Sequence, residues 1–396
     1  MFFSVLSIIF IKVRINVKWE QRKLGEVILD YKRKNNNDRL PVLTSSFQGI
    51  EYQEKHFGSQ QKHDTSDYNV LPKEYMTYRN RSDNGYFRFN INNLGVTGIV
   101  SKFYPVFTTI NTNKLFLASY INHNHRLKNH FKVVSVGTSQ HVLSLRNFKK
   151  TNLLFPSKDE QDQIGKFFNL LNRAITLQQR KLEQLRQLKI FTLQRMFIDK
   201  DCKQPILRFK NFNDNWLPHK FNDIANTFSG GTPAISNKDY YGGNIPFIRS
   251  AEINKNTTQL HLTPDGLKNS SAKFIKKGTL LYALYGATSG EVGIAQIDGA
   301  INQAVMAINL KKDNVYFIKT WLIKNKRKII STYLQGGQGN LSAKIVKHLK
   351  LSLPKIEEEK LISITIMKID SLIKLQQSKI DDLVNLKKYL LQKLFI

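Results

Sequence analysis

The segment LQQRKLEQLRQL at residues 177–188 returns 198 positions later as LQQSKIDDLVNL at 375–386. Ten of the 21 residues in 177–197 are identical to their counterparts at this offset, far more than chance would give. The match extends upstream to Pro156 and Pro354, and an offset of 197 pairs Trp19 with Trp216. The 396-residue chain is therefore built from two related halves, each of which ends in the same kind of segment.

Both segments carry the heptad pattern of helices that pack against a partner, because apolar residues recur in steps of four and three. Ser157 and Glu160 predict an N-cap with a capping box at the start of the first helix. The acidic run at 357–359 suits the positively polarised start of the second helix. The predicted seam residues are Ile164, Phe168, Leu171, Ile175, Gln178, Leu182 and Leu185 in the first helix and Ile362, Ile366, Ile369, Ile373, Gln376, Ile380 and Leu383 in the second.

We expect these two helices to pair with each other as an antiparallel coiled coil. At about 1.5 Å per residue, some 40 residues make a rod roughly 60 Å long. An antiparallel pair would relate the halves by a pseudo-twofold axis and place the domains between the helices at opposite ends of the rod. A parallel pair would place them side by side. Gln178 and Gln376 lie near the middle of each helix, where an antiparallel pair would let them meet and fix the register. The alternative is that each glutamine points to solvent.

The regions between the shared segments, 27–136 and 224–335, show no sequence similarity to each other. Both are typical of mixed α/β domains with short strands, because apolar runs alternate with turn signals. The candidate strands are 88–91 and 96–100 in the first region and 279–284, 292–297 and 304–310 in the second. The predicted organisation is an atypical N-terminal segment (1–18), a first domain (19–155), a central helix (156–200), a second domain (201–353) and a C-terminal helix (354–396).

The charge is the most unusual feature of the composition, because 61 Lys and Arg stand against 30 Asp and Glu, a formal net charge of +31. Such an excess favours nucleic acid as the partner over an anionic membrane surface or an acidic protein. Arginine and lysine hold phosphates, and Arg, Asn and Gln read base edges. The candidate DNA contacts, taken from basic and turn-rich segments, are Lys32, Arg33, Arg39, Arg79, Arg81 and Gln140 in the first domain and Thr232, Lys238, Tyr240, Arg249, Tyr285 and Gln338 in the second. For any one of them the alternative is a solvated surface residue.

No catalytic or metal site can be assembled from the sequence. YGATSGEVG at 285–293 lacks the Lys-Ser/Thr ending of a nucleotide-binding loop and predicts a tight turn between strands. His123, His125 and His130 have no Cys or carboxylate at ligand spacing beside them, which favours polar surface or nucleic-acid contact over a metal site. None of the ten prolines adjoins another, so the Asn/Asp-Pro-Pro-aromatic segment of DNA amino-methyltransferases is absent. We therefore expect a binding protein without catalytic residues, metal or cofactor of its own.

The single cysteine, Cys202, excludes an internal disulfide framework and fits a reducing, cytoplasmic compartment. The apolar stretch at 2–11 is too short to span a bilayer, and no basic residue precedes it. We expect no membrane association.

Taken together, the chain resembles the specificity (S) subunit of type I restriction-modification systems over nearly its whole length. The segments that carry the resemblance are WEQRKLGEV at 19–27, RFKNFNDNWLPHKFNDIA at 208–225, FSGGTP at 228–233, GGNIPFIRSAEI at 242–253, YGATSGEVGIAQIDGAINQAV at 285–305 and GGQGNLSAKIVKHLKLSLPKIEEEKLI at 336–362. Trp19 departs from the pattern, because it lacks the Arg-Phe-x-x-Phe lead that precedes Trp216.

The resemblance implies two target-recognition domains that each read one half of a split, asymmetric DNA target, with the helices setting the gap between the halves. It also implies that two methyltransferase (M) subunits dock on the chain and that restriction (R) subunits join for cleavage. S-adenosylmethionine, ATP and Mg would then be bound by those partners. Two alternatives remain: a coiled-coil assembly protein with non-specific DNA binding, and the remnant of a fused restriction-methylation enzyme.

Overall fold

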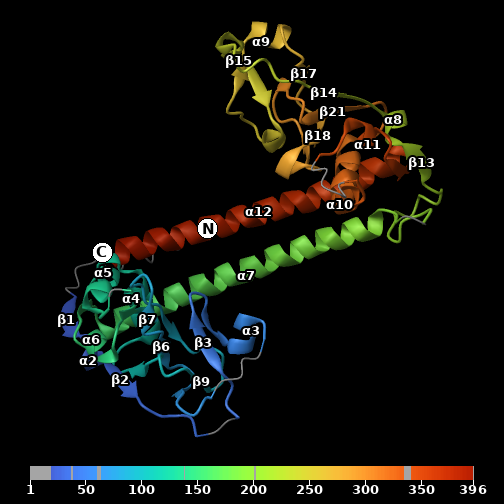
Figure 1. Cartoon of the computed structure of the whole chain (residues 1–396). Coiled ribbons are helices and arrows are strands. Elements are labelled where there is room, and N and C mark those ends of the chain that lie inside the picture. Colours follow the sequence, from blue (N-terminus) through green and yellow to red (C-terminus); the bar gives the residue numbers. More distant parts are fainter. Residues whose placement is uncertain are drawn as a thin grey trace. The chain divides into compact units, whose positions relative to one another are not determined.

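The computed structural model describes residues 19–36, 39–59, 64–137, 139–199, 202–333 and 340–395. The apolar stretch at 2–11 and the candidate contact Gln338 lie outside these residues. The chain divides into two compact units: unit 1 comprises Met1–Arg180 and Gln377–Ile396, and unit 2 comprises Lys181–Gln376. Two long helices, α7 (Lys158–Met196) and α12 (Ile356–Leu394), each contribute one part to unit 1 and one part to unit 2 (Figure 1).

The two long helices pack antiparallel, as predicted. In unit 1 the first turns of α7, with Ile164 and Phe168, share a hydrophobic core with Leu391 near the end of α12. In unit 2 the end of α7, at Met196, shares a core with Ile362 near the start of α12. Each unit therefore holds the beginning of one helix against the end of the other.

The predicted seam follows the inward face of both helices, because a heptad repeat keeps these positions on one side. The buried members are Ile164, Phe168, Leu171, Ile175 and Leu182 on α7 and Ile362, Ile366, Ile369, Gln376 and Ile380 on α12. The half-buried members are Gln178, Leu185, Ile373 and Leu383.

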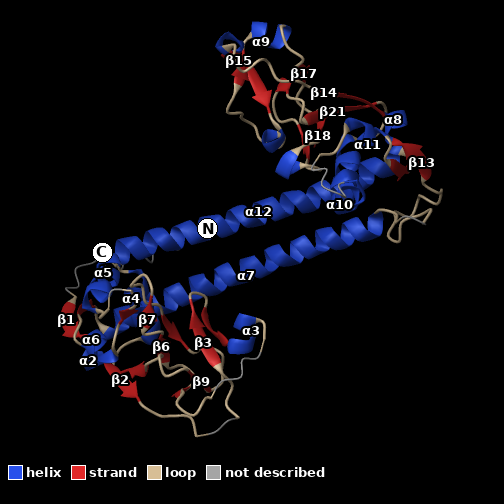
Figure 2. Cartoon of the chain, in the orientation of Figure 1, coloured by secondary structure: helices blue, strands red, loops and turns tan. Residues whose placement is uncertain are grey.

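Unit 1 is an α/β domain whose short strands form small antiparallel sheets (Figure 2). The central sheet has the order β2-β10-β6-β8, and β1 pairs with β12 beside the start of α7. The elements of this unit before α7 are β1 (Glu20–Lys23), α2 (Leu24–Val27), β2 (Ile28–Tyr31), β3 (Leu43–Ser46), β4 (Gly49–Tyr52), α3 (Gln53–Phe57), β5 (Asn69–Leu71), β6 (Met76–Tyr78), β7 (Arg81–Ser82), β8 (Phe89–Ile91), β9 (Gly98–Val100), β10 (Val106–Thr109), α4 (Lys114–His123), α5 (His125–Val134), β11 (His141–Val142), α6 (Leu145–Lys149) and β12 (Asn152–Phe155).

Unit 2 repeats this framework with strands β14-β21-β18-β19 in the central sheet and β13 paired with β22. A second four-stranded sheet, β16-β15-β20-β17, has no counterpart among the described strands of unit 1. The elements are β13 (Leu217–Lys220), α8 (Phe221–Ile224), β14 (Ala225–Ser229), η1 (Lys238–Tyr240), β15 (Tyr241–Ile248), η2 (Ser250–Glu252), β16 (His261–Leu262), α9 (Pro264–Lys268), β17 (Lys273–Ile275), β18 (Leu280–Ala283), η3 (Gly286–Thr288), β19 (Val292–Ile294), β20 (Gly299–Ile301), β21 (Val305–Leu310), α10 (Val315–Tyr333), α11 (Ala343–Lys347) and β22 (Lys350–Leu353).

An aromatic cluster in each unit anchors the end of one long helix. In unit 1, Phe395 stacks on Tyr120 with ring centroids 4.9 Å apart and also contacts Trp19. In unit 2, Phe197 stacks on Phe317 at 4.9 Å, and Trp216 lies against both rings. Phe395 and Phe197 are separated by 198 residues, so the repeat seen in the sequence is also a repeat of packing.

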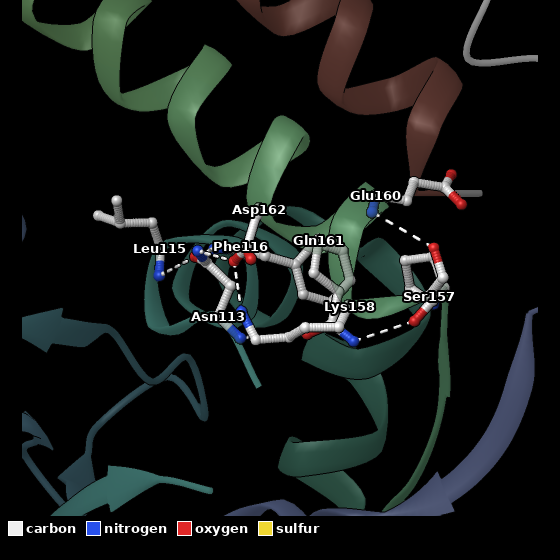
Figure 3. A network of polar contacts seen from close by, with 9 residues as sticks. Asn113, Leu115, Phe116, Ser157, Lys158, Glu160, Gln161 and Asp162 are labelled. Atoms are coloured by element: carbon white, nitrogen blue, oxygen red, sulfur yellow. Dashed lines mark hydrogen bonds and ion pairs between the residues drawn. The ribbon is translucent and has the colours of Figure 1, made fainter. Parts of the chain in front are cut away.

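The start of α7 is fixed by polar contacts with the start of α4 (Figure 3). The Ser157 hydroxyl accepts a hydrogen bond from the Glu160 backbone N–H at 3.3 Å, so the predicted N-cap is confirmed. Asn113 caps α4 through its side-chain oxygen and donates from its amide nitrogen to Asp162 at 2.6 Å. Gln161 accepts a hydrogen bond from the Asn113 backbone N–H, and the two helix starts are thereby held together.

The acidic start of α12 does more than complement the helix dipole. Glu358 and Glu359 are both 1 % exposed. Glu358 receives two hydrogen bonds from the Arg208 guanidinium, each 2.8 Å long. Glu359 accepts a hydrogen bond from the Asn314 backbone N–H at 2.7 Å. The sequence predicted only the favourable position of this run at the helix start, and the structure adds that two of its carboxyl groups link α12 to other segments of unit 2.

Replacing Glu359 with glutamine should remove a pH dependence of stability. Burial, with a smaller contribution from Asp313, raises the pKa of Glu359 from 4.5 to about 8. The folded state therefore keeps a proton that the unfolded state loses, so the free energy of unfolding falls as pH rises from 4.5 to 8. Glu359→Gln mimics the protonated form and should be more stable than the parent by about 1–3 kcal/mol at pH 8.5, with little difference at pH 4.5.

Urea denaturation of the full chain across this pH range measures the effect. Glu357→Gln is the matched control, because Glu357 is exposed on the same turn. Parallel pH profiles for Glu359→Gln and the parent would contradict the prediction.

Candidate nucleic-acid interface

A groove of about 810 Å³ in unit 1 gathers basic, polar and aromatic side chains. It lies between the β3–β4 hairpin with α3 and the segment that follows β6; Figure 1 labels β3, α3 and β6. Its basic lining residues are Lys55, His56, Arg79, Arg81 and Arg88. Its acidic ones are Glu51 and Asp83, so positive charge dominates. A basic concave surface of this kind suits a phosphate backbone.

Three aromatic side chains stand exposed on the lining of this groove. Phe47 is 76 % exposed, Phe57 is 52 % exposed and Tyr86 is 44 % exposed. Large apolar rings in contact with water carry a free-energy cost that burial against a partner removes. In a basic groove they offer flat surfaces for sugars and bases.

Two predicted DNA contacts line this groove, and a third lies beside it. Arg79 is exposed, and the Arg81 guanidinium lies 3.8 Å from the centre of the Phe103 ring, a cation–π contact that orients it. Gln140 donates a weak hydrogen bond of 3.4 Å to Asp83, which lines the groove. The structure therefore brings Arg79, Arg81 and Gln140 together around one concave surface.

The other predicted contacts of unit 1 do not line the groove. Lys32 and Arg33 are exposed in the segment that follows β2, where the Arg33 carbonyl accepts a hydrogen bond from the Val70 backbone. Arg39 is also exposed.

In unit 2 the predicted contacts lie on several separate turns. Thr232 donates to the side chain of Gln303, and Lys238 is exposed on η1, with Tyr240 half-buried at its end. Tyr285 is 37 % exposed and precedes η3, in the turn between β18 and β19 that the sequence predicted.

Arg249 is the exception, because its guanidinium is already bound within unit 2. It donates to Glu252 at 3.1 Å through Nε and to Gln259 at 2.8 Å. Burial opposes ionisation of Glu252, but hydrogen bonds from Arg249 and the Gln259 backbone lower the pKa of this carboxyl. Arg249 is therefore held in place rather than free to move toward a ligand.

The sequence missed Phe47, Lys55, Phe57, Tyr86 and Arg88 as groove residues. The aromatic residues resemble core residues in a linear sequence, and Arg88 directly precedes an apolar strand. Among the described residues, no group of three or more His, Cys, Asp and Glu side chains is arranged to hold a metal ion. No helix within the described ranges is both long and apolar enough to cross a bilayer.

Comparison with known proteins shows which protein family this chain matches. The profile of the family described as "Type I restriction modification DNA specificity domain" matches residues 16–187 and 213–385, one copy for each half. Together these ranges cover most of the chain.

Two curated relatives come from Methanocaldococcus jannaschii. The "Type I restriction enzyme MjaIX specificity subunit" is 27% identical over 167 residues, which cover 39% of this chain and 38% of that protein. The "Putative type I restriction enzyme MjaX specificity subunit" is 24% identical over 275 residues, which cover 66% of this chain and 63% of that protein. The matched regions thus span less than two thirds of each relative.

Solved structures show the same fold. The S subunit of a type I restriction-modification system from M. genitalium superposes with a TM-score of 0.63 at 13% identity and covers 97% of both chains. A chain from a structure on complex assembly and conformational transition of the type I R-M system superposes with a TM-score of 0.55 at 15% identity. It covers 96% of this chain and 98% of that one.

Proposed function

Because the chain belongs to the type I restriction modification DNA specificity family, we propose that it is the DNA sequence-specificity subunit of a type I restriction-modification complex. The observation that carries this proposal is the repeated framework: both units have the same central sheet order, yet the loops on that framework differ in sequence. Two similar frameworks with unlike loops suit two unlike half-sites, and the target is therefore an asymmetric, split sequence.

Unit 1 reads its half-site through the groove that contains Arg79 and Arg81. An arginine can donate two parallel hydrogen bonds to a guanine edge or to a phosphate. The surrounding rings of Phe47 and Tyr86 exclude water from such contacts. In unit 2 the same role falls to the turns around Thr232, Lys238, Tyr240 and Tyr285.

The methyltransferase partners dock on apolar residues that the long helices leave exposed. In unit 1, Leu177 is 62% exposed and Tyr389 is 56% exposed. In unit 2, Phe191 is 51% exposed and Leu375 is 69% exposed. These side chains lie on helix faces that the described cores do not cover, and burial against a partner would stabilise the assembly. S-adenosylmethionine binds to the methyltransferase subunits, and ATP and Mg bind to the restriction subunits. This chain therefore determines which DNA sequence is bound and does not carry out the reaction.

Mapping of methylated adenines tests the proposal. DNA from cells that express the chain with its methyltransferase partners should carry methylation only at one split target with two unlike halves. Methylation by the purified chain and S-adenosylmethionine alone would favour a fused enzyme instead. Equal affinity for every duplex in a selection experiment would favour a coiled-coil assembly protein.

Arg79→Gln should weaken binding of the complex to its target DNA by about 1–3 kcal/mol, because it removes a charged donor from the groove of unit 1. The half-site that unit 2 reads should keep its sequence preference. Lys73→Gln is the matched control, since Lys73 is an exposed cation of unit 1 that does not line the groove. Competition binding with a set of single-base variants of the target measures both effects. An equal loss for the two substitutions would show that only net charge matters.

A further inference from the structure

A second cavity of about 280 Å³ opens beside the groove of unit 1 and shares Phe47, Tyr86 and Arg88 with it. Its remaining lining residues are Phe87, Asn122, His125 and Lys128. The side chain of Asn122 accepts a hydrogen bond from the Phe89 backbone N–H at 3.0 Å and donates to the Phe89 carbonyl at 2.7 Å. These two bonds join β8 to α4, so the backbone beside Arg88, the residue that directly precedes β8, is held in place at the cavity wall.

Positive charge collects around this cavity. Arg88, Lys128 and Lys387 of α12 are half-buried. Burial, and then repulsion by Arg88, lowers the pKa of both Lys128 and Lys387. Burial alone lowers the pKa of Arg88. Arg88 is therefore close enough to each of the two lysines to oppose its charge, and Lys128 lines the cavity together with Arg88.

None of the described residues that line this cavity is acidic. None of the three cations forms an ion pair with a described carboxylate, and Arg88 Nε is buried without a hydrogen-bond partner there. His123 adds no charge, because burial lowers its pKa to about 4. Its Nδ1 donates to the Ser119 carbonyl at 2.8 Å, which fixes the neutral tautomer. A buried cation without a partner is costly, so an anionic ligand would relieve both the unpaired charge and the repulsion.

We propose that Arg88 and Lys128, which both line this cavity, form a phosphate-binding site, and that in the DNA complex this site takes one backbone phosphate of the duplex that lies in the adjoining groove. The continuity of the two concave surfaces through Phe47, Tyr86 and Arg88 favours a duplex phosphate over a free one. The guanidinium of Arg88 supplies paired donors, and the ammonium group of Lys128 supplies a point charge. The DNA part of this inference rests on the proposed function.

The salt dependence of DNA binding tests the duplex source. Lys128→Gln in the full chain should weaken binding to every duplex by the same factor, about three- to tenfold at 0.1 M salt, and reduce the slope of log K against log salt by about one. The base preference should not change. Arg126→Gln is the control, because Arg126 is an exposed cation on α5, the helix that also carries Lys128, and it does not line the cavity. For Arg126→Gln the slope of log K against log salt should equal that of the parent. Equal slopes for Lys128→Gln and Arg126→Gln would overturn the proposal.

Thermal unfolding of the free chain tests the site without DNA. Lys128→Gln should raise the melting temperature by roughly 1–3 °C in chloride, because it relieves repulsion. Inorganic phosphate should raise the melting temperature of the parent above that in chloride of equal ionic strength, and it should not do so for Lys128→Gln. A lower melting temperature of Lys128→Gln would mean a structural role and would overturn the proposal.

The DNA-binding and thermal-unfolding measurements together distinguish failure of the phosphate site from failure of the proposed function. A phosphate-dependent thermal shift with an unchanged DNA slope would mean that the site takes free phosphate and would overturn the duplex assignment. If the parent binds no duplex at all, the proposed function fails, and the thermal shift still decides whether the cavity takes a phosphate.

Discussion

Replacement of Phe395 with alanine is expected to destabilise unit 1 by about 3–5 kcal/mol, because it empties the centre of an aromatic cluster. Phe395 is 4 % exposed, and its ring stacks on Tyr120. Trp19, Phe116 and Phe168 surround it with ring centroids 6.0 to 6.5 Å away. These neighbours come from three separate segments, namely α4, α7 and the residue before β1, so they cannot all move into the cavity. In a unit of this size the loss corresponds to roughly 10 °C in melting temperature.

Tyr389→Ala provides the comparison for Phe395→Ala. Tyr389 lies on α12, six residues before Phe395, but it is 56 % exposed, so its removal should cost under about 1 kcal/mol. Differential scanning calorimetry of the full chain should show a shift of one transition for Phe395→Ala and almost none for Tyr389→Ala. Similar shifts would mean that the end of α12 does not belong to the core of unit 1.

The two long helices and their pairing could be predicted because the sequence pattern that specifies each helix lies within the helix itself. A heptad repeat in 164–185 and 362–383 defines one face on each helix, and the identity at an offset of 198 assigns both the same role. The antiparallel orientation was predicted from Gln178 and Gln376, which lie near the middle of the two helices.

The common sheet of the two units could not be predicted in this way. The offset between matching strands changes from 197 residues at β2 and β14 to 204 at β6 and β18, so a comparison at one offset finds nothing. Strand pairing depends on buried alternation and on partners far apart in the chain, and different side chains satisfy both. The two regions therefore share a topology without sharing a sequence.

The residues that line the groove of unit 1 could also be predicted only in part from the sequence. Arg79 and Arg81 were predicted because basic residues in a turn are readily identified in a sequence. Phe47 and Phe57 were missed, since residue type does not tell whether a ring is buried or exposed. Arg249 was predicted as a contact, but its carboxylate partner Glu252, three residues further on, binds its guanidinium.

The pair of Arg208 and Glu358 in unit 2 gives the second large effect that we expect. Their side chains are 11% and 1% exposed, and two hydrogen bonds of 2.8 Å join them. Glu358→Gln should cost about 3–5 kcal/mol, because it leaves the buried guanidinium without its counter-charge. Denaturant unfolding of the full chain, followed by tryptophan fluorescence, measures the loss. The double variant Arg208→Met with Glu358→Leu should recover most of it, since two apolar side chains need no partner.

The equivalent glutamate of unit 1 should respond in the opposite direction. Glu160 corresponds to Glu358 at the offset of 198, but one of its oxygens is buried without a partner among the described residues. Burial raises the pKa of Glu160, and a hydrogen bond from Trp19 only partly counteracts it. In unit 2 the indole N–H of Trp216 has no described partner, because Glu358 is bound by Arg208 instead. Glu160→Gln should therefore leave stability at pH 7 unchanged or raise it by up to about 1 kcal/mol, since glutamine keeps the acceptor for Trp19 and removes the unpaired charge. A loss at Glu160→Gln as large as that at Glu358→Gln would show that the two glutamates play one structural role despite their different partners.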